Sequence, residues 1–196
     1  MPIKGIEQPE YIEIDKKIRL RKFDGKYDFA FEWYQDIDTV WMLDGDKEPY
    51  TQELLDKMYT WWSQTGEVYF IEVLEDEIYK SIGDVSFKQD DMPILIGDKN
   101  YRKKGIAIKV IRKLIERGKE LGYKELKIKE IYSWNLDSQK LYTNLGFKTF
   151  IGWWRTIGWV AVADETECLA GRAIIGDRCV RGRPVMQVYV RAVTLA

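Results

Sequence analysis

Three consecutive basic residues stand immediately before a glycine in the stretch YRKKGIA. Apolar residues recur at helical spacing from Gly105 onward, so Arg102, Lys103 and Lys104 lie at a predicted helix N-terminus. Positive charge at that end opposes the helix dipole unless an anion binds there. Unpaired amides at a helix N-terminus favour phosphate, and a glycine lets a ligand approach the backbone. The stretch is typical of a pyrophosphate-binding loop formed by the amides of 103–107, although a solvated basic surface gives the same pattern.

Histidine is absent from the 196 residues, which excludes several kinds of catalytic centre. Neither a Ser-His-Asp nor a Cys-His nucleophile can be built, and no metal site can have histidine ligands. The two cysteines, Cys168 and Cys179, are too few for a zinc cage. Acid–base chemistry must therefore come from carboxylates, tyrosine, lysine or water, and we expect no bound metal.

A second segment, EIYSWNLDSQKLYTNLGF at 130–147, carries the pattern E-x4-N-x2-S-x2-L-Y-x3-G-F. It begins 25 residues after Gly105. Together with YRKKGIA, this segment resembles the GNAT superfamily of acyl-CoA-dependent N-acetyltransferases, including its ribosomal-protein N-terminal and aminoglycoside 6'-N-acetyltransferase branches. The resemblance covers residues 17–150, and its most specific part runs from Ile94 to Phe147.

The resemblance implies a binding site for acetyl-CoA as cosubstrate. In the family, backbone amides of the first motif bind the pyrophosphate, and the preceding strand splays away from its neighbour to pair with the pantetheine arm. The residues implied in coenzyme binding are Ile94, Leu95, Ile96, Gly97, Arg102, Lys103, Lys104, Gly105, Ile106 and Ala107. Asn135 matches the asparagine that contacts the coenzyme arm, and it can also cap the following helix. Ser138 fits either a phosphate ligand or a polar residue of the first helical turn.

Two residues are implied in catalysis by the same resemblance. Tyr142 matches a tyrosine near the acetyl-CoA sulfur, whose hydroxyl protonates or hydrogen-bonds the departing thiolate. Glu130 matches the glutamate that serves as base in ribosomal-protein N-terminal acetyltransferases. A base is needed because an amine is mostly protonated near pH 7 and must lose a proton before it attacks the thioester. The alternatives are that Tyr142 is a core aromatic residue and that Glu130 points to solvent.

Hydrophobic periodicity predicts the elements that position these residues. Strands are expected at 17–23, 67–76, 78–89, 91–98, 125–132, 148–154 and 185–191, and helices at 24–36, after a Thr51 N-cap, at 105–121 and from Asn135 to Leu145. This order predicts a single GNAT-like α/β (α+β) domain, with a mixed central sheet of about six to seven strands flanked by about four helices.

The composition predicts a folded, soluble protein. Hydrophobic residues make up 45% of the chain and charged residues 32%, as in globular domains. The net charge of -1 provides no basic field for nucleic acid, and no apolar run is long enough to span a membrane. The N-terminal stretch has no signal-peptide core. We therefore expect a cytoplasmic monomer or homodimer without nucleic-acid or membrane partners.

Residues 151–196 differ in composition from residues 1–150. The first segment contains 20 lysines and 5 arginines, whereas the second contains no lysine and 6 arginines. At the earlier density about six lysines would be expected in the second segment. We therefore predict an acetyltransferase core at 1–150 and a distinct tail at 151–196, which either closes the sheet or is a read-through or fusion segment.

The acceptor site is expected between the first two helices and the strands that face the thioester. This region is rich in acidic and aromatic residues: Trp33, Asp36, Asp38, Trp41, Asp44, Asp46, Glu48, Tyr50, Trp61 and Trp62. Such groups attract cationic amines, although several of the tryptophans could instead be core residues. We predict acetyl transfer to the primary amine of a cationic small molecule, such as an aminoglycoside or a polyamine. Two alternatives are an N-terminal protein or peptide acetyltransferase and a non-catalytic coenzyme A-binding GNAT domain.

Overall fold

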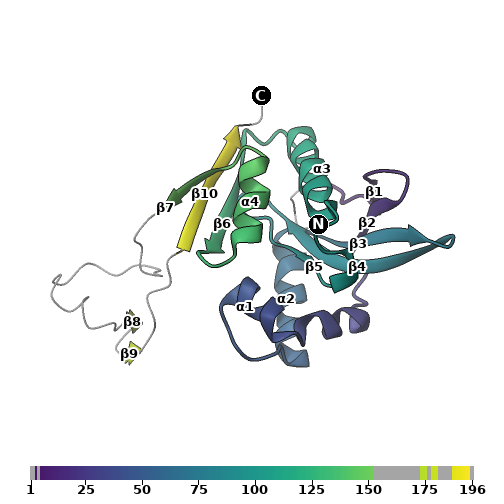
Figure 1. Cartoon of the computed structure of the whole chain (residues 1–196). Coiled ribbons are helices and arrows are strands. Elements are labelled where there is room, and N and C mark those ends of the chain that lie inside the picture. Colours follow the sequence, from purple (N-terminus) through teal and green to yellow (C-terminus); the bar gives the residue numbers. More distant parts are fainter. Residues whose placement is uncertain (1–2, 4, 152–172, 176–177, 181–186, 195–196) are drawn as a thin grey trace.

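The computed structural model of the chain describes residues 3, 5–151, 173–175, 178–180 and 187–194, with side chains described for 3, 5–129 and 131–148. Within this part of the chain, helices flank two antiparallel sheets of five and three strands, and two further strands form a small separate sheet (Figure 1). The architecture is a single mixed α/β domain, as predicted from the order of elements.

Five strands form the first sheet, in the order β1-β2-β3-β4-β5. They are β1 (Tyr11–Glu13), β2 (Ile18–Lys22), β3 (Glu67–Glu75), β4 (Ile78–Phe87) and β5 (Ile94–Ile96). The alternation predicted for β2 is confirmed, because Ile18 and Leu20 are both buried. The strand expected over 91–98 is shorter than predicted, since Pro93 has no N–H to donate and Asp98 caps a following 3-10 turn, η2 (Lys99–Tyr101).

The second sheet has the order β6-β10-β7. Its strands are β6 (Glu125–Tyr132), β10 (Gln187–Thr194) and β7 (Lys148–Ile151), while β8 (Ala173–Ile175) pairs with β9 (Arg178–Val180). Among the described strands, β5 pairs only with β4 and β6 only with β10. The two sheets therefore diverge between β5 and β6, and the candidate site lies where they part.

The strand expected at 185–191 begins outside the described residues. Its described part belongs to β10, which pairs antiparallel with both β6 and β7. The origin of the segment 151–196 stays a prediction.

Four α-helices flank the sheets in the described part of the chain. They are α1 (Ile37–Asp44), α2 (Gln52–Thr65), α3 (Ile106–Glu120) and α4 (Leu136–Asn144). The predicted caps of two helices are confirmed: the Thr51 side chain accepts from the amide of Leu54, and the Asn135 side chain accepts from that of Ser138. Figure 1 shows α1 and α2 together on one side of the molecule, below the ends of β5 and α4.

The helix predicted over 24–36 is wrong. This stretch forms a 3-10 helix, η1 (Asp28–Tyr34), and a separate helix, α1, begins three residues later. Four of the seven residues of η1 are aromatic and favour α-helix only weakly, so their packing decides the conformation. Asp36 is the N-cap residue of α1, and its side chain accepts from the hydroxyl of Thr39.

Neither tryptophan of α2 is fully buried in the core. Leu55 and Tyr59 form the buried face of this helix, whereas Trp61 is 48% exposed and Trp62 is partly buried. Part of the indole of Trp61 therefore remains exposed at the surface of α2.

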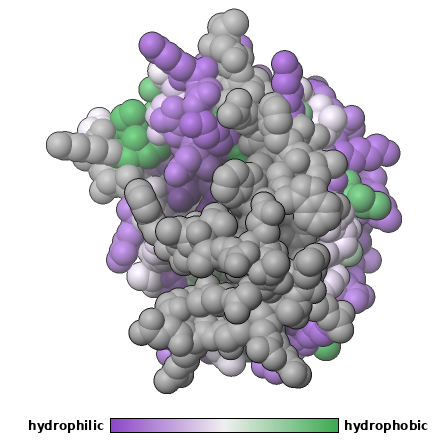
Figure 2. All heavy atoms as spheres, turned by 90° about the vertical axis from the view of Figure 1, so that its left-hand side faces the viewer, coloured by the Kyte–Doolittle hydropathy of each residue, from purple (hydrophilic) through white to green (hydrophobic). Residues whose placement is uncertain are grey.

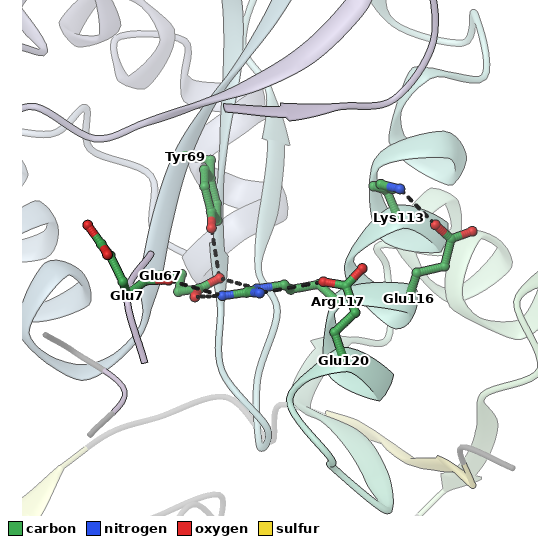
Figure 3. Close-up of polar contacts among 7 residues, drawn as sticks. All are labelled: Glu7, Glu67, Tyr69, Lys113, Glu116, Arg117 and Glu120. Atoms are coloured by element: carbon green, nitrogen blue, oxygen red, sulfur yellow. Dashed lines mark hydrogen bonds and ion pairs between the residues drawn. The ribbon is translucent and has the colours of Figure 1, made fainter. Parts of the chain in front are cut away.

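An ion pair fixes α3 against the first sheet (Figure 3). Arg117 of α3 donates from Nη2 to Oε1 of Glu67 at 2.8 Å, and the Tyr69 hydroxyl donates to Oε2 of Glu67 at 2.7 Å. Glu67 is almost fully buried, so loss of its partner would leave an uncompensated charge, which typically costs about 3–5 kcal/mol. This contact holds the C-terminal half of α3 and thereby sets where its N-terminus points.

A second buried carboxylate joins the first sheet to the helical layer. Asp84 of β4 accepts hydrogen bonds from the hydroxyls of Tyr34 in η1, at 2.9 Å, and Tyr59 in α2, at 2.6 Å. Burial raises the pKa of Asp84 to about 6, while the two hydroxyls act in the opposite direction. The network fixes η1 and α2 against the sheet beside β5.

Hydrophilic residues predominate on the coloured part of the face in Figure 2, and hydrophobic residues form only small separate patches there. In the described part of the chain, no helix is both long and apolar enough to cross a membrane.

Candidate functional site

Two residues with positive φ precede the N-terminus of α3. Lys103 has φ +59° and Gly105 has φ +76°. The first amides of a helix have no intrahelical acceptor, and within the described chain none of the backbone amides of 103–108 donates to a backbone or side-chain group outside α3. These N–H groups, at the positive end of the helix dipole, can bind a phosphate.

The two glycines of the first motif serve different purposes. A Cβ on Gly105 would meet no atom within 4 Å, so the space beside these amides is open to a ligand. A Cβ on Gly97 would lie 2.2 Å from the side chain of Trp33, so this glycine is required for packing.

The outer edge of β5 carries peptide groups that no described strand uses, although the carbonyl of Ile96 accepts from Nε of Arg102. The amide of Ser86 in β4 donates to the carbonyl of Pro93 at 3.1 Å, and Asp84 pairs with Leu95. Because peptide groups alternate along a strand, those of Ile94 and Ile96 point away from β4, toward the space between the sheets. No described strand pairs with this edge, which can therefore bind an extended chain of amides such as the pantetheine arm.

A cleft of about 770 Å³ joins the β5 edge to the start of α3. Residues of α1, β5, α3 and α4 line it. Those already implied by the sequence are Ile94, Leu95, Ile96, Arg102, Lys103, Gly105, Ile106, Ala107, Asn135 and Ser138. The tertiary structure thus brings the two sequence motifs together in the lining of one cleft.

The remaining predicted residues do not line this cleft. Lys104 extends over the ring of Tyr101, with Nζ 5.2 Å from the ring centroid. Tyr142 lines a second cavity, and the side chain of Glu130 lies outside the described residues. The backbone of Glu130 is at a β-bulge, because Val188 and Val190 of β10 pair with residues of β6 that are three positions apart.

The second cavity, of about 240 Å³, adjoins the cleft. The residues that line both are Met42, Leu43, Ile94, Asn135 and Ser138. The cavity also contains Tyr142 and two carboxylates, those of Asp44 and Asp91. It lies beyond the β5 edge, where a group carried along that edge would meet a second reactant.

Tyr142 lies at the end of the β5 edge. Its hydroxyl donates to the carbonyl of Met92 at 2.5 Å, two residues before Ile94. Burial, and to a lesser extent the charge of Asp91, raise the pKa of Tyr142. The phenol therefore stays protonated at working pH and can donate a hydrogen bond.

Asp91 is a cavity residue that the sequence did not single out. One oxygen, Oδ1, accepts from the amides of Met92 at 3.1 Å and Lys129 at 3.2 Å, so it joins the lead into β5 to β6 where the strands diverge. The other oxygen makes no hydrogen bond to a described residue. Burial raises the pKa of Asp91, although the two amides and the charge of Lys88 act to lower it. The only sequence signal was an acid directly before the strand that leads into the first motif.

Aromatic residues form the wall of the second cavity nearest α2. The rings of Trp61 and Trp62 are 4.8 Å apart at 74°. The ammonium of Lys88 lies 4.6 Å from the first ring and 5.2 Å from the second. This indole pair therefore already binds one ammonium group in the structure. Burial also raises the pKa of Asp44, in the same cavity.

Asn135 connects the walls of the cleft. Its Oδ1 caps α4 through the amide of Ser138, and its Nδ2 donates to the carbonyl of Met42 in α1 at 2.9 Å. Asn135 can therefore cap α4 and line the cleft at the same time.

Residues 27–147 match the sequence profile of the acetyltransferase (GNAT) family, which is well over half of the chain. No curated protein sequence is significantly similar to the chain.

Several solved structures share the fold. A domain from Methanocaldococcus jannaschii has a TM-score of 0.63 at 21% identity, covering 92% of this chain and 100% of that one. The Salmonella typhimurium acetyltransferase that modifies the N-terminal serine of ribosomal protein L7/L12 has a TM-score of 0.61 at 14% identity, with coverages of 95% and 100%. The microcin C7 self-immunity acetyltransferase MccE, solved with acetyl-CoA and AMP, has a TM-score of 0.58 at 18% identity, with coverages of 95% and 97%.

Proposed function

The chain belongs to the acetyltransferase (GNAT) family, and from this premise we propose that it acetylates the primary amine of a cationic small molecule, such as an aminoglycoside or a polyamine. The donor is acetyl-CoA, as in the family. The second cavity supports this acceptor class, because it combines carboxylates with an indole pair that already holds an ammonium group.

We assign the donor to the cleft. The free amides before and at the start of α3 fit the pyrophosphate, and the open space at Gly105 allows it to approach them. The outer edge of β5 fits the pantetheine amides. This arrangement brings the thioester to the end of the edge, beside Tyr142.

The transfer requires a base and a group that stabilises the departing sulfur. Asp91 removes a proton from the acceptor ammonium, directly or through water, and the nitrogen then attacks the thioester carbonyl. The carbon–sulfur bond breaks, and the hydroxyl of Tyr142 turns from the carbonyl of Met92 to donate its hydrogen bond to the thiolate. The thiolate takes up the second proton, which the nitrogen loses as the amide forms. Glu130 is the second candidate for the base.

The cavity size limits what part of the acceptor enters. Small-molecule sites commonly have about 300–1,000 Å³, and this cavity has about 240 Å³. It therefore fits the amine-bearing end of an acceptor, such as one aminosugar ring or an aminopropyl arm, with the rest outside.

An acetyl-CoA consumption screen with the full chain tests the acceptor class. Tobramycin, spermidine and a serine-initiated peptide serve as acceptors at equal concentrations. We expect turnover of at least one of the two cationic small molecules and little turnover of the peptide. Preferential turnover of the peptide would replace the proposal by N-terminal acetylation, and coenzyme binding without any turnover would leave a non-catalytic domain.

Replacing Gly105 by valine is expected to weaken coenzyme A binding by at least about tenfold, or about 1.4 kcal/mol. The new side chain enters the open space over the free amides, and it strains a backbone with φ +76°. Isothermal titration calorimetry measures the affinity.

Gly122 provides a matched control for this strain. It has φ +75°, and a Cβ there would also meet no atom within 4 Å, but it lies past the other end of α3. Gly122→Val is expected to lose similar stability and to keep its coenzyme affinity. If folded Gly105→Val binds coenzyme A as tightly as the unmutated protein does, the pyrophosphate does not bind at this loop.

A further inference from the structure

Arg102, which belongs to the basic stretch before α3, does not extend freely into the cleft. Its Nε donates to the carbonyl of Ile96 at 2.8 Å, and its Nη2 donates to the carbonyl of Gly97 at 3.2 Å and to Oγ1 of Thr39 at 2.9 Å. Its Nη1 also lies 3.9 Å from a carboxylate oxygen of Asp36. The guanidinium thus joins the end of β5 to the N-terminal turn of α1.

The carbonyl of Ile96 is the last one on the free edge of β5. By alternation it points to the same side as the peptide groups of Ile94, and Arg102 already occupies it. A chain of amides bound along this edge can therefore use both polar groups of Ile94 but only the N–H of Ile96. The contact defines where a donor must leave the strand and turn toward the amides before α3.

The contact to Thr39 fixes one end of α1. Thr39 is buried, and its hydroxyl also donates to Asp36. The opposite end of α1 is held by the loop after β6, where Nε1 of Trp134 donates to the carbonyl of Trp41 at 3.1 Å. Helix α1 thus spans the cleft between the two diverging sheets. On the β5 side it is attached by Arg102 and, more exposed, by Lys99, whose Nζ donates to Oδ1 of Asp36 at 2.9 Å.

Lys103 lines the same cleft as Arg102 but makes none of these contacts. Its side chain makes no hydrogen bond or ion pair with a described residue. A phosphate can attract this ammonium without breaking any contact. Arg102 commits its Nε and Nη2 to three charge-assisted hydrogen bonds, so only its Nη1, which lies 3.9 Å from Asp36, is left for the same phosphate.

We propose that Arg102 is a positioning residue that sets the end of the pantetheine track and holds α1 over it, whereas Lys103 supplies the free cation for the pyrophosphate. The inference concerns the donor half of the site. It holds whichever amine is the acceptor, and it is tested through donor binding.

Two donors distinguish the roles, since S-acetylpantetheine has the thioester arm of acetyl-CoA but no phosphate. Arg102→Gln is expected to weaken the binding of both donors by the same factor, about tenfold. Lys103→Gln is expected to weaken acetyl-CoA and not S-acetylpantetheine. Competition against a fluorescent coenzyme A analogue measures both affinities without an acceptor. Loss of acetyl-CoA affinity alone in Arg102→Gln would make Arg102 a phosphate ligand and overturn the proposal.

The salt dependence of acetyl-CoA binding distinguishes a lost phosphate contact from a purely structural effect. Increasing ionic strength weakens a contact between an exposed cation and phosphate. The salt dependence of acetyl-CoA affinity should therefore decrease in Lys103→Gln and stay unchanged in Arg102→Gln. A decrease in Arg102→Gln would contradict the positioning role.

Thr39→Val keeps the proposal testable if Arg102→Gln folds poorly. Valine retains the shape of threonine but removes the oxygen that accepts from Arg102. This variant should also weaken both donors, and the double variant should lose less than the sum of the single losses, because the two residues act through one contact. Unchanged binding of both donors in Thr39→Val would refute the attachment of α1 by Arg102.

Discussion

Replacing Tyr142 by phenylalanine is expected to lower kcat roughly 10²–10³-fold, the usual loss when one preorganised donor to a developing negative charge is removed. The hydroxyl lies at the end of the free β5 edge and donates to the carbonyl of Met92. Because burial raises the pKa of Tyr142, the phenol stays protonated over the working pH range and can transfer its one hydrogen bond from the carbonyl of Met92 to the departing thiolate. Single-turnover kinetics measure the chemical step, and acetyl-CoA affinity should change little.

Tyr69→Phe is the matched control. Tyr69 is also fully buried and donates one short hydrogen bond, to Glu67, but it lines neither cavity. Tyr142→Phe should lose about 1 kcal/mol of stability, and Tyr69→Phe about 1.5–3 kcal/mol because its acceptor is a carboxylate, yet only Tyr142→Phe should lose turnover. Equal rate constants in both variants would reduce Tyr142 to a packing residue.

Asp91→Asn is expected to lower kcat/KM by roughly 10²–10³-fold at pH 6–7, and by less as the pH approaches the pKa of the acceptor amine. Asparagine keeps an oxygen for the amides of Met92 and Lys129, so the junction of the sheets is preserved. The base must be deprotonated to act, and burial raises its pKa, so the activity of the unmutated enzyme falls as pH decreases through that raised value. In Asp91→Asn the ionisation of this carboxyl no longer affects the rate, and the pH–rate profile follows the ionisation of the acceptor amine alone.

Two further variants assign the base. Asp90 is the neighbouring carboxylate, but it is exposed and pairs with Lys88, so Asp90→Asn should leave the pH profile unchanged. Glu130→Gln tests the residue implied by the family resemblance. Glu130 is the base if Glu130→Gln loses activity mainly at low pH and the pH–rate profile of Asp91→Asn is parallel to that of the unmutated enzyme.

Features that depend on neighbours within about one helical turn could be predicted from the sequence. The start of α3 after Gly105, the Thr51 and Asn135 caps and the bounds of β6 all agree with the structure. Each rests on a local hydrogen-bond pattern or on a hydrophobic period, which can be recognised without knowing the partner. The spacing of the two motifs likewise indicated the family, because it reflects short elements joined in a fixed order.

Contacts between residues far apart in the chain could not be predicted in this way and became visible only in the folded structure. The partner of Arg102 on α1 is 63 residues away, and the partner of Tyr142 is 50 residues away. No local rule specifies such pairs, because packing of the whole chain sets them. The same reason explains the error over 24–36, where aromatic packing replaced the expected helix by η1 and α1, and the omission of Asp91. That carboxylate became a candidate base only because β5 and β6 diverge beside it and bury it next to Tyr142.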